Sequence, residues 1–228
     1  MSGVEPHRRR ERKYPLSLAE LLRFRWWQRG HGRAFTPAYP TRTVNNIYFD
    51  SPDWTNYGDN MSGVSDRTKC RLRWYGELET GAEATFEVKR RRNAIGHKRG
   101  QRVPMSELHL RSLPIERLYT RLRVLLPAEL RLQLDQCHRP VLYNRFRREY
   151  YEAPDGLRLT VDTDIVHAPL RGSSLPALRP TPGATHAVVE LKYPLERRPE
   201  AQEAFRRLPF RATRFSKYMA GIDHLLPY

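Results

Sequence analysis

The chain has 228 residues with 41 Lys and Arg against 25 Asp and Glu, which gives a formal net charge of +16. The length suits one domain, and we expect a single domain over residues 1–228. The 2 cysteines are too few for a disulfide framework. No secretory signal and no run of about 18 apolar residues is visible, so we expect a soluble, cytoplasmic protein without a transmembrane segment. The positive charge favours polyanionic partners: nucleic acid, anionic lipid or phosphate-rich small molecules.

Taken in chain order, the pattern predicts a sheet of short strands interrupted by helices. Residues 8–14 are a basic arm or a first strand. A capping box, Ser17 with Glu20 three residues on, opens a helix over residues 17–27. Loops are predicted over residues 29–40 and 168–185, strands over 43–50, 67–75, 85–91, 96–103, 140–151, 157–165 and 186–193, and helices over 114–126, 200–208 and 215–226.

Several predicted strands keep their charges on one face, because successive side chains of a strand point to opposite sides. Over residues 67–75 the odd positions are nearly all cationic, whereas the even positions are mostly apolar. Residues 85–89, 157–165 and 186–193 repeat this alternation. Over residues 141–150 it is less clean: Tyr143 and Arg145 oppose Leu142 and Phe146, while Arg148 interrupts the apolar face.

Each of these strands alone fits an ordinary amphipathic sheet whose polar face meets water. The amphipathic helices at residues 17–27, 115–126 and 215–226, however, can cover the apolar faces. A sheet that is coated outside and charged inside is expected to close into a barrel with a polar lumen. The pairs Glu87/Lys89 and Glu190/Lys192 place a carboxylate beside an ammonium group. Phosphate together with a divalent metal needs both kinds of group, whereas a nucleic-acid groove has little use for inward carboxylates.

Taken together, these residues resemble the triphosphate tunnel metalloenzymes, and within them the polyphosphate-polymerase (VTC) domain in a bacterial-type, stand-alone form. The resemblance covers most of the chain and follows the family order: Glu11-x-Lys13-Tyr14, Ile47-Tyr48-Phe49-Asp50-Ser51, Lys69-x-Arg71-x-Arg73, Glu87-x-Lys89, Lys98, Tyr143-x-Arg145, Arg158-x-Thr160-x-Asp162, Glu190-x-Lys192 and Arg214-Phe215-Ser216-Lys217-Tyr218. It implies an α+β fold: a closed antiparallel tunnel of about eight strands, CYTH-like, with helices packed on the outside.

The resemblance also implies a set of site residues. The residues expected to act in catalysis are Arg71, Arg73, Lys217 and Glu190. Those expected to bind phosphate or nucleotide are Lys13, Lys69, Lys89, Lys98, Tyr143, Arg145, Arg158, Lys192, Arg214 and Ser216. Those expected to hold Mn²⁺ or Mg²⁺ are Glu190, Glu87 and Glu11.

The activity implied is a metal-dependent transfer of the γ-phosphate of ATP onto a growing polyphosphate chain. Two alternatives stay open at this point. One is an inorganic or nucleoside triphosphatase on the same fold, with water as the acceptor. The other is a module that binds polyphosphate or nucleic acid without turnover. The expected partners are ATP and inorganic polyphosphate or triphosphate; nucleic acid is disfavoured, and the sequence does not predict an oligomeric state.

Overall fold

The computed structural model describes residues 9–30, 35–77, 83–92, 95–110, 114–170, 175–176, 186–206, 208 and 210–225. The chain divides into two compact units that are interleaved in sequence. Unit 1 comprises Met1–Arg42, Arg147–Ile165 and Gly183–Phe215, and unit 2 comprises Thr43–Phe146, Val166–Pro182 and Ser216–Tyr228. Three strands contribute residues to both units. The single domain expected over residues 1–228 stays a prediction.

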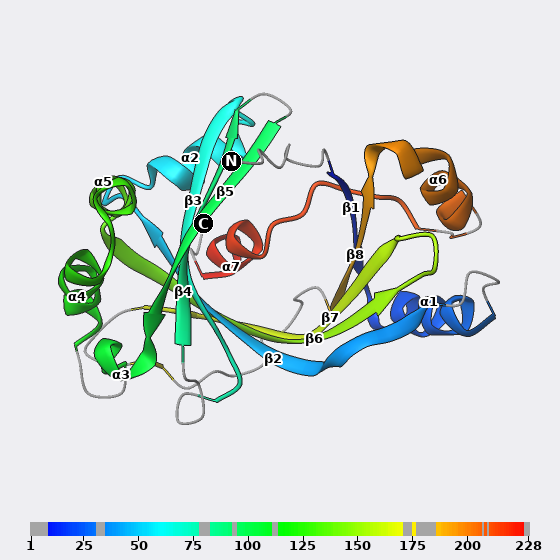
Figure 1. Cartoon of the computed structure of the whole chain (residues 1–228), viewed down its shortest axis with the longest axis horizontal. Coiled ribbons are helices and arrows are strands. Elements are labelled where there is room, and N and C mark those ends of the chain that lie inside the picture. The colour runs from blue at the N-terminus through cyan, green and yellow to red at the C-terminus, as the bar shows by residue number, and fades with distance from the viewer. Residues whose placement is uncertain are drawn as a thin grey trace, which may run out of the picture. The chain divides into compact units, whose positions relative to one another are not determined.

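Eight strands form the sheet, in the order β1-β8-β7-β6-β2-β3-β4-β5 (Figure 1). Their bounds are β1 Arg9–Leu16, β2 Thr36–Asp50, β3 Asp66–Tyr75, β4 Glu83–Arg92, β5 Ile95–Pro104, β6 Arg139–Glu152, β7 Arg158–Pro169 and β8 Ala187–Pro194. The antiparallel pairing and the eight strands with helices packed against them confirm the predicted fold class.

The strand order differs from the expected tunnel in one respect, because among the described strands it is open and ends at β1 and β5. The physical reason is visible on β5. Its described side chains are exposed except Val103, and Lys98, Arg99 and Arg102 lie along it. Charged side chains of this kind discourage a further strand from pairing with a sheet edge.

In unit 1, helices α1 (Leu18–Gly30) and α6 (Arg198–Arg206) pack against strands β1, β7 and β8. Tyr14 of β1 stacks on Phe205 of α6 with ring centroids 5.1 Å apart, and Phe24 of α1 is fully buried in the same core. The predicted capping box begins α1. The backbone N–H of Ser17 donates to Glu20 at 2.8 Å, and the N–H of Glu20 donates to the Ser17 hydroxyl at 3.3 Å.

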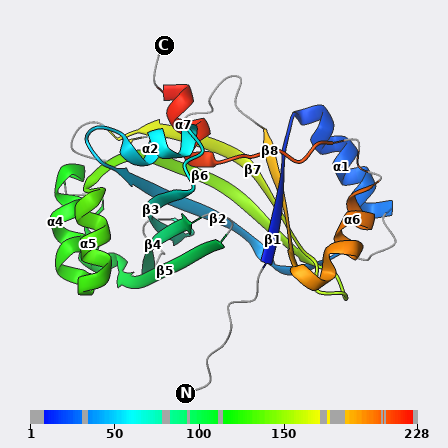
Figure 2. The same cartoon turned by 90° about the horizontal axis from the view of Figure 1, so that it is seen from above.

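In unit 2, helices α4 (Leu118–Leu125) and α5 (Ala128–Gln136) lie on one side of strands β3, β4 and β5 in both views (Figures 1 and 2). They bury the apolar face of these strands, on which Leu72, Trp74 and Phe86 are fully buried. The remaining helices of unit 2 are α2 (Thr55–Met61), α3 (Met105–Leu108) and α7 (Lys217–Leu225). Short 3₁₀ turns lie at Ile115–Arg117 in unit 2 and at Leu195–Arg197 in unit 1.

The observed elements differ from the predicted ones at a few places. The segment at residues 8–14 is a strand from Arg9, and β2 begins at Thr36, inside the predicted loop 29–40. The richness of residues 29–40 in Gly, Arg and Pro predicts a loop there. However, β3 pairs with β2 only from Val44 onward, so Pro37 and Pro40 cost no hydrogen bond to β3.

The sequence does not predict helices α2, α3 and α5, and most of the predicted loop 168–185 lies outside the described residues. Among the residues that the structure does describe, no helix combines the length and the apolar character needed to cross a membrane.

Candidate functional site

Unit 2 carries a cluster of cations on the face of β3, β4 and β5 opposite the apolar core. The strand register places Lys69 beside Lys89, and Lys89 beside Lys98, so three lysines lie in one row across three strands. Like charges directly opposite one another destabilise a sheet. We call Lys69, Arg71, Arg73, Lys89 and Lys98, together with Glu87, the cationic cluster; its excess of positive charge suits a polyanionic ligand.

Glu87 is the carboxylate at the centre of the cationic cluster. Its Oε2 lies 2.6 Å from Nη2 of Arg71, and its Oε1 lies 2.5 Å from Nζ of Lys98. Burial alone would raise the pKa of Glu87, but the charges of Arg71, Arg73 and Lys98 outweigh it and lower the pKa to about 2. Glu87 is therefore ionised at neutral pH and holds two of the cations in place.

The residue opposite Glu87 on β5 is Gly100. A Cβ at this position would lie 3.1 Å from the carbonyl oxygen of Phe86 and 3.3 Å from Cγ2 of Thr85, both tighter than ordinary contact, and 3.6 Å from Cγ of Glu87, which is an ordinary van der Waals contact. A larger residue would therefore crowd β4 at Phe86 and Thr85 rather than the side chain of Glu87.

Arg73 is positioned by a chain of buried amides. Its Nε donates to Oδ1 of Asn46 at 2.8 Å, and Nδ2 of Asn46 donates to Oδ1 of Asn144 at 3.2 Å. Nδ2 of Asn144 then donates to the carbonyl oxygen of Val166 at 3.1 Å. The sequence analysis did not identify Asn46 or Asn144. Asparagine is depleted in strands, and a buried amide needs partners, so their presence on predicted strands was the available signal.

Helix α7 brings two of the expected residues to unit 2. Nζ of Lys69 donates to the hydroxyl of Ser216 at 2.9 Å, directly before α7 begins. Lys217 is 8% exposed, and its Nζ lies 4.7 Å from the ring centroid of Phe146. Ser216 and Lys69 are thus in contact, as a shared role in phosphate binding requires.

Contacts of Asp50 and His167 anchor α7. The buried Asp50 accepts hydrogen bonds from the hydroxyl of Tyr218 and from the backbone N–H groups of Asn56 and Tyr57 at 2.9 and 3.0 Å. Nε2 of His167 lies 3.1 Å from the carbonyl oxygen of Lys217. Asp50 belongs to the Ile47–Ser51 motif; its role is to hold the helix that carries Lys217.

Unit 1 carries a second charged cluster, in which signs alternate. Across β1 and β8, Lys13 pairs with Glu190 and Glu11 pairs with Lys192. Nζ of Lys13 lies 3.1 Å from Oε1 of Glu11 and 3.6 Å from Oε1 of Glu190, and Nζ of Lys192 lies 3.3 Å from Oε2 of Glu190. We call these four residues, together with Arg148 and Asp162, the mixed-charge cluster.

Arg148 is the residue of this cluster that the sequence analysis missed. Its Nε and Nη2 donate to the two carboxylate oxygens of Asp162 at 2.5 and 2.7 Å, and its Nη2 lies 3.8 Å from Oε2 of Glu190. Burial disfavours the charged form of Arg148, but the charges of Asp162 and Glu190 outweigh it and raise its pKa above the usual value. A bidentate pair of this kind fixes the guanidinium group beside Glu190.

The mixed-charge cluster fits a divalent metal that takes its remaining ligands from phosphate. Glu11 and Glu190 both contact Lys13, and Thr160, the β7 partner of Glu190, has a buried hydroxyl without a hydrogen-bond partner among the described residues. Within the described part of the chain, no group of three or more His, Cys, Asp or Glu gathers as a metal cage. Mg²⁺ is commonly bound by one or two carboxylates plus substrate phosphates, which this donor set can supply.

The structure sets Tyr143 apart from the charged clusters. It lies in the apolar core of unit 2, stacks on Trp74 at 5.8 Å, and its hydroxyl donates to Asn45 at 2.8 Å. Burial raises the pKa of Tyr143 to about 12, although the charge of Arg145 opposes that shift. On β6, Asn144 and Arg148 make the polar contacts described above. Both lie on the face that was expected to be apolar, whereas Tyr143, on the face expected to be polar, lies in the apolar core.

Two further expected residues of unit 1, Arg158 and Arg214, have solvent-exposed side chains. Arg158 pairs with Glu152 at 3.2 Å, and both side chains are about half exposed. Arg214 is exposed, in a segment whose neighbour Thr213 donates from its backbone N–H to the carbonyl oxygen of Lys13 at 2.9 Å. The structure brings neither residue into an ion pair with Glu190.

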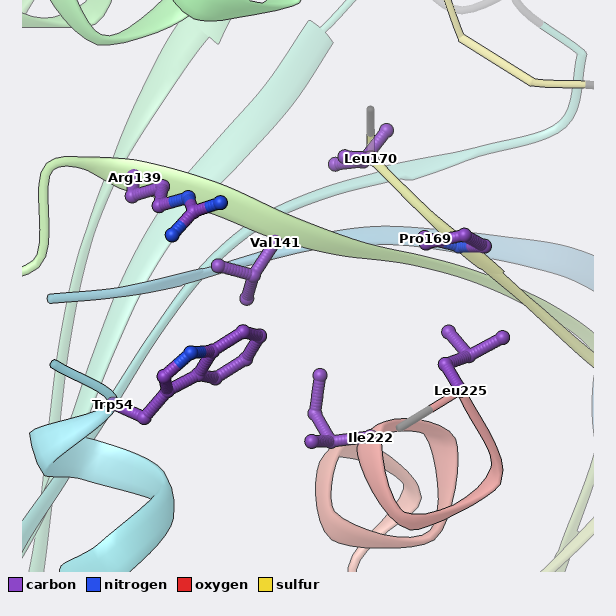
Figure 3. A pocket seen from close by; sticks show the side chains of 7 residues that line it. All are labelled: Trp54, Arg139, Val141, Pro169, Leu170, Ile222 and Leu225. Carbon is purple, nitrogen blue, oxygen red and sulfur yellow. The ribbon is translucent and has the colours of Figure 1, made fainter. Parts of the chain in front are cut away.

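Unit 2 also contains a small apolar pocket of a different character (Figure 3). Its lining comes from the start of α2, from β6, from the end of β7 and from α7, and consists of Trp54, Arg139, Val141, Pro169, Leu170, Ile222 and Leu225. Arg139 is the one charged side chain of this lining, and its Cζ lies 5.9 Å from the Trp54 ring. The pocket lacks the set of cations that a triphosphate needs, so we place the candidate phosphate site on the charged clusters.

Comparisons with known proteins identify the family. The family model of the VTC domain matches residues 8–226, so the chain belongs to the VTC-domain family. Among solved structures it is similar to HpAC1 from Hippeastrum, an adenylyl cyclase candidate with a dominant triphosphatase activity, at 14% identity, 94% coverage of both chains and a TM-score of 0.57. It is also similar to the PH1819 protein from Pyrococcus horikoshii OT3, at 13% identity, 94% coverage of this chain, 98% of that chain and a TM-score of 0.51. No curated protein sequence matches the chain.

Proposed function

We propose that the chain is a metal-dependent polyphosphate polymerase that moves the γ-phosphoryl group of ATP onto the end of a polyphosphate chain. The observation that carries this proposal is the row of Lys69, Lys89 and Lys98 on neighbouring strands. Together with Arg71 and Arg73, this row outnumbers the single carboxylate Glu87 of the cationic cluster, and a linear polyanion with a charge on every phosphate matches that excess of positive charge. Membership of the VTC-domain family supports the same substrate class.

The proposed reaction needs positioning and charge stabilisation rather than an enzyme nucleophile. A terminal oxygen of polyphosphate forms a bond to the γ-phosphorus, the bond from that phosphorus to the β–γ bridging oxygen breaks, and ADP leaves with the electron pair. Arg71 and Arg73 are held by Glu87 and Asn46, so their guanidinium groups are already oriented for phosphate oxygens. With Lys217 they neutralise the charge that develops during transfer.

We assign phosphate contacts in unit 2 to Lys69, Lys89, Lys98 and Ser216, and in unit 1 to Lys13 and Lys192. Arg145, Arg158 and Arg214 stay predictions as further phosphate ligands, since they lie outside the two clusters. Tyr143 is buried in the apolar core, so we give it a supporting role only.

Glu190, assisted by Glu11, is the proposed ligand of Mn²⁺ or Mg²⁺. Glu190 and Glu11 would hold this ion, which would supply neutralisation of phosphate charge. The ion pairs of Glu190 with Lys13, Lys192 and Arg148 span 3.3–3.8 Å, whereas Glu87 is held by Arg71 and Lys98 at 2.5–2.6 Å. Glu87 is therefore better suited to orienting cations than to coordinating a metal.

A second candidate is a triphosphatase, in which water replaces the polyphosphate oxygen as the acceptor. The similarity to HpAC1, which has a dominant triphosphatase activity, supports this second candidate. Both reactions need the same cations and the same metal, and they differ only in the acceptor.

Product analysis tests the proposal. Purified protein is incubated with ATP and Mn²⁺, with and without a short polyphosphate primer, and the products are separated on a gel. We expect a ladder of polyphosphate with a matching amount of ADP. Orthophosphate alone would replace the polymerase with the triphosphatase. If the protein shows no turnover and tripolyphosphate does not raise its melting temperature, both candidate functions are wrong.

Substitution of Glu190 tests the metal assignment in the same assay. We expect Glu190→Gln to lower metal-dependent turnover about a thousandfold, since several kcal/mol of charge stabilisation are lost. The matched control is Glu129→Gln on α5, because the Glu129 side chain is 76% exposed and pairs only at the surface with Arg99. Unchanged turnover in Glu190→Gln would remove Glu190 from the site.

A further inference from the structure

An exposed group of aromatic side chains lies in unit 1 beside the mixed-charge cluster. Residues Thr36 to Arg42 of β2 are all exposed, and the ring of Tyr39 is 58% exposed. Tyr39 meets Tyr150 of β6 edge to face, with ring centroids 5.6 Å apart and an interplanar angle of 80°. Neither ring belongs to the apolar core of unit 1, so core packing does not explain this pair.

A guanidinium group completes this arrangement. Cζ of Arg42 lies 5.4 Å from the ring centroid of Tyr39 and 6.0 Å from that of Tyr150. Cation–π contacts of this length orient the arginine against both rings. The result is an exposed, cationic and aromatic group of three side chains, in which the two tyrosine rings stand nearly perpendicular to each other; we call it the stacking platform.

The stacking platform is linked by contact to the mixed-charge cluster. On Tyr150, the same ring that meets Arg42 also lies 5.9 Å from Cζ of Arg148. Arg148 in turn binds Asp162 and lies 3.8 Å from Glu190. The platform therefore adjoins residues that we have assigned to phosphate and metal.

We propose that Tyr39, Arg42 and Tyr150 bind the nucleobase of the nucleoside triphosphate by stacking. This inference rests on the proposed function, because it assigns the base of the proposed nucleoside triphosphate substrate. Every nucleobase has a π face that stacks on aromatic rings and on arginine, and the stacking does not require base-edge hydrogen bonds. The platform thus favours nucleotides over inorganic triphosphate and discriminates weakly among bases, with purines preferred for their larger stacking area.

Two ligands that share a triphosphate separate base binding from phosphate binding. Dissociation constants of ATP and of inorganic tripolyphosphate are measured by calorimetry for the wild type, Tyr39→Ala, Tyr39→Phe and Arg42→Ala. We expect Tyr39→Ala to raise the dissociation constant of ATP about 5- to 100-fold, while that of tripolyphosphate is unchanged. Tyr39→Phe keeps the ring and should restore ATP binding. Arg42→Ala should weaken ATP more than tripolyphosphate.

The matched control is Trp26→Ala on α1. Trp26 is 76% exposed in the same unit and makes no contact with the stacking platform among those described above. We expect Trp26→Ala to leave both dissociation constants unchanged. This would show that loss of an exposed aromatic side chain alone does not weaken the binding of ATP.

The outcomes distinguish this inference from the proposed function. If Tyr39→Ala leaves ATP binding unchanged, or weakens ATP and tripolyphosphate equally, the base subsite is overturned while the phosphate site stands. If the wild type binds neither ligand, the proposed function itself fails. A preference for ATP over UTP in the wild type that disappears in Tyr39→Ala would support stacking.

Discussion

The two charged clusters of this protein differ in how positive and negative side chains are arranged. In unit 2, rows of like charge lie next to one another, and one buried carboxylate, Glu87, sits among them. In unit 1, signs alternate across β1 and β8, so that Lys13 faces Glu190 and Glu11 faces Lys192. The first cluster has charge left over for a polyanion, whereas much of the second is compensated within the protein.

This difference indicates a division of labour. A cluster with more cations than carboxylates supplies affinity for phosphate, because each close charge pair with the ligand is favourable. A compensated cluster supplies geometry, because its carboxylates and cations hold one another in fixed positions. We therefore expect substitutions in the two clusters to differ in what they change.

The largest effect is expected at the buried pair of unit 1. Asp162→Asn removes the bidentate carboxylate of the buried Arg148, which keeps its longer 3.8 Å pair with Glu190, and breaking a buried pair in this way costs about 3–5 kcal/mol. Both side chains are at most 10% exposed, so solvent cannot compensate. The measurement is the free energy of unfolding in urea at neutral pH.

The matched control for this prediction lies on the same strand. Asp164 pairs with Arg147 at 3.9 Å, and both side chains are more than 60% exposed. Asp164→Asn should leave stability nearly unchanged, because exposed pairs contribute little and asparagine tolerates the positive φ of 52° at this residue. Equal effects of the two substitutions would contradict the compensated, buried character of the mixed-charge cluster.

The next effect concerns the lone carboxylate of the cationic cluster. Glu87 has its pKa lowered from 4.5 to about 2, so it stabilises the fold fully above pH 4.5 and loses this contribution as pH falls towards 2. At pH 7, Glu87→Gln should cost about 3 kcal/mol, and the gap to the wild type should close between pH 4.5 and 2. Unfolding measured across this pH range checks the prediction.

The same variant should bind metal-free tripolyphosphate more tightly, since Arg71 and Lys98 are released to the ligand. Loss of stability with a gain in affinity would mark Glu87 as an organiser of cations. A stability gap that does not change with pH would show that the ionised carboxylate is not what stabilises the fold. A loss of affinity instead would show that the orientation of Arg71 matters more than its free charge.

The sequence predicts the two clusters unequally well, and the reason is the clarity of the strand pattern. From Lys69 to Trp74 of β3 the charged and apolar positions alternate without a break, so Arg71 and Arg73 are predicted on one face with Leu72 on the other. On β6, arginines stand on both faces, and the pattern alone does not show that Arg148 is the buried one. Its burial depends on Asp162, which lies on β7 and is found only by folding.

Other residues were missed for the same physical reason. Asn46 and Asn144 form a hydrogen bond across 98 positions of sequence, which no local pattern reveals. Helix α5 was missed because Leu130, Leu132 and Leu134 alternate with the period of a strand. In the structure Leu130 and Leu134 are buried on the helix, whereas Leu132 is 65% exposed.

The smallest predicted effect tests the assignment of β6 faces. Tyr143→Phe removes a hydroxyl that donates to Asn45 in the apolar core, and we expect it to lower the free energy of unfolding by about 1 kcal/mol. Because Tyr143 stacks on Trp74 away from the cations, the dissociation constant of tripolyphosphate should stay unchanged. Lys89→Met is the positive control, which should weaken the binding of tripolyphosphate. If Tyr143→Phe weakened it comparably, the hydroxyl would contact phosphate, and the core position of this side chain would be wrong.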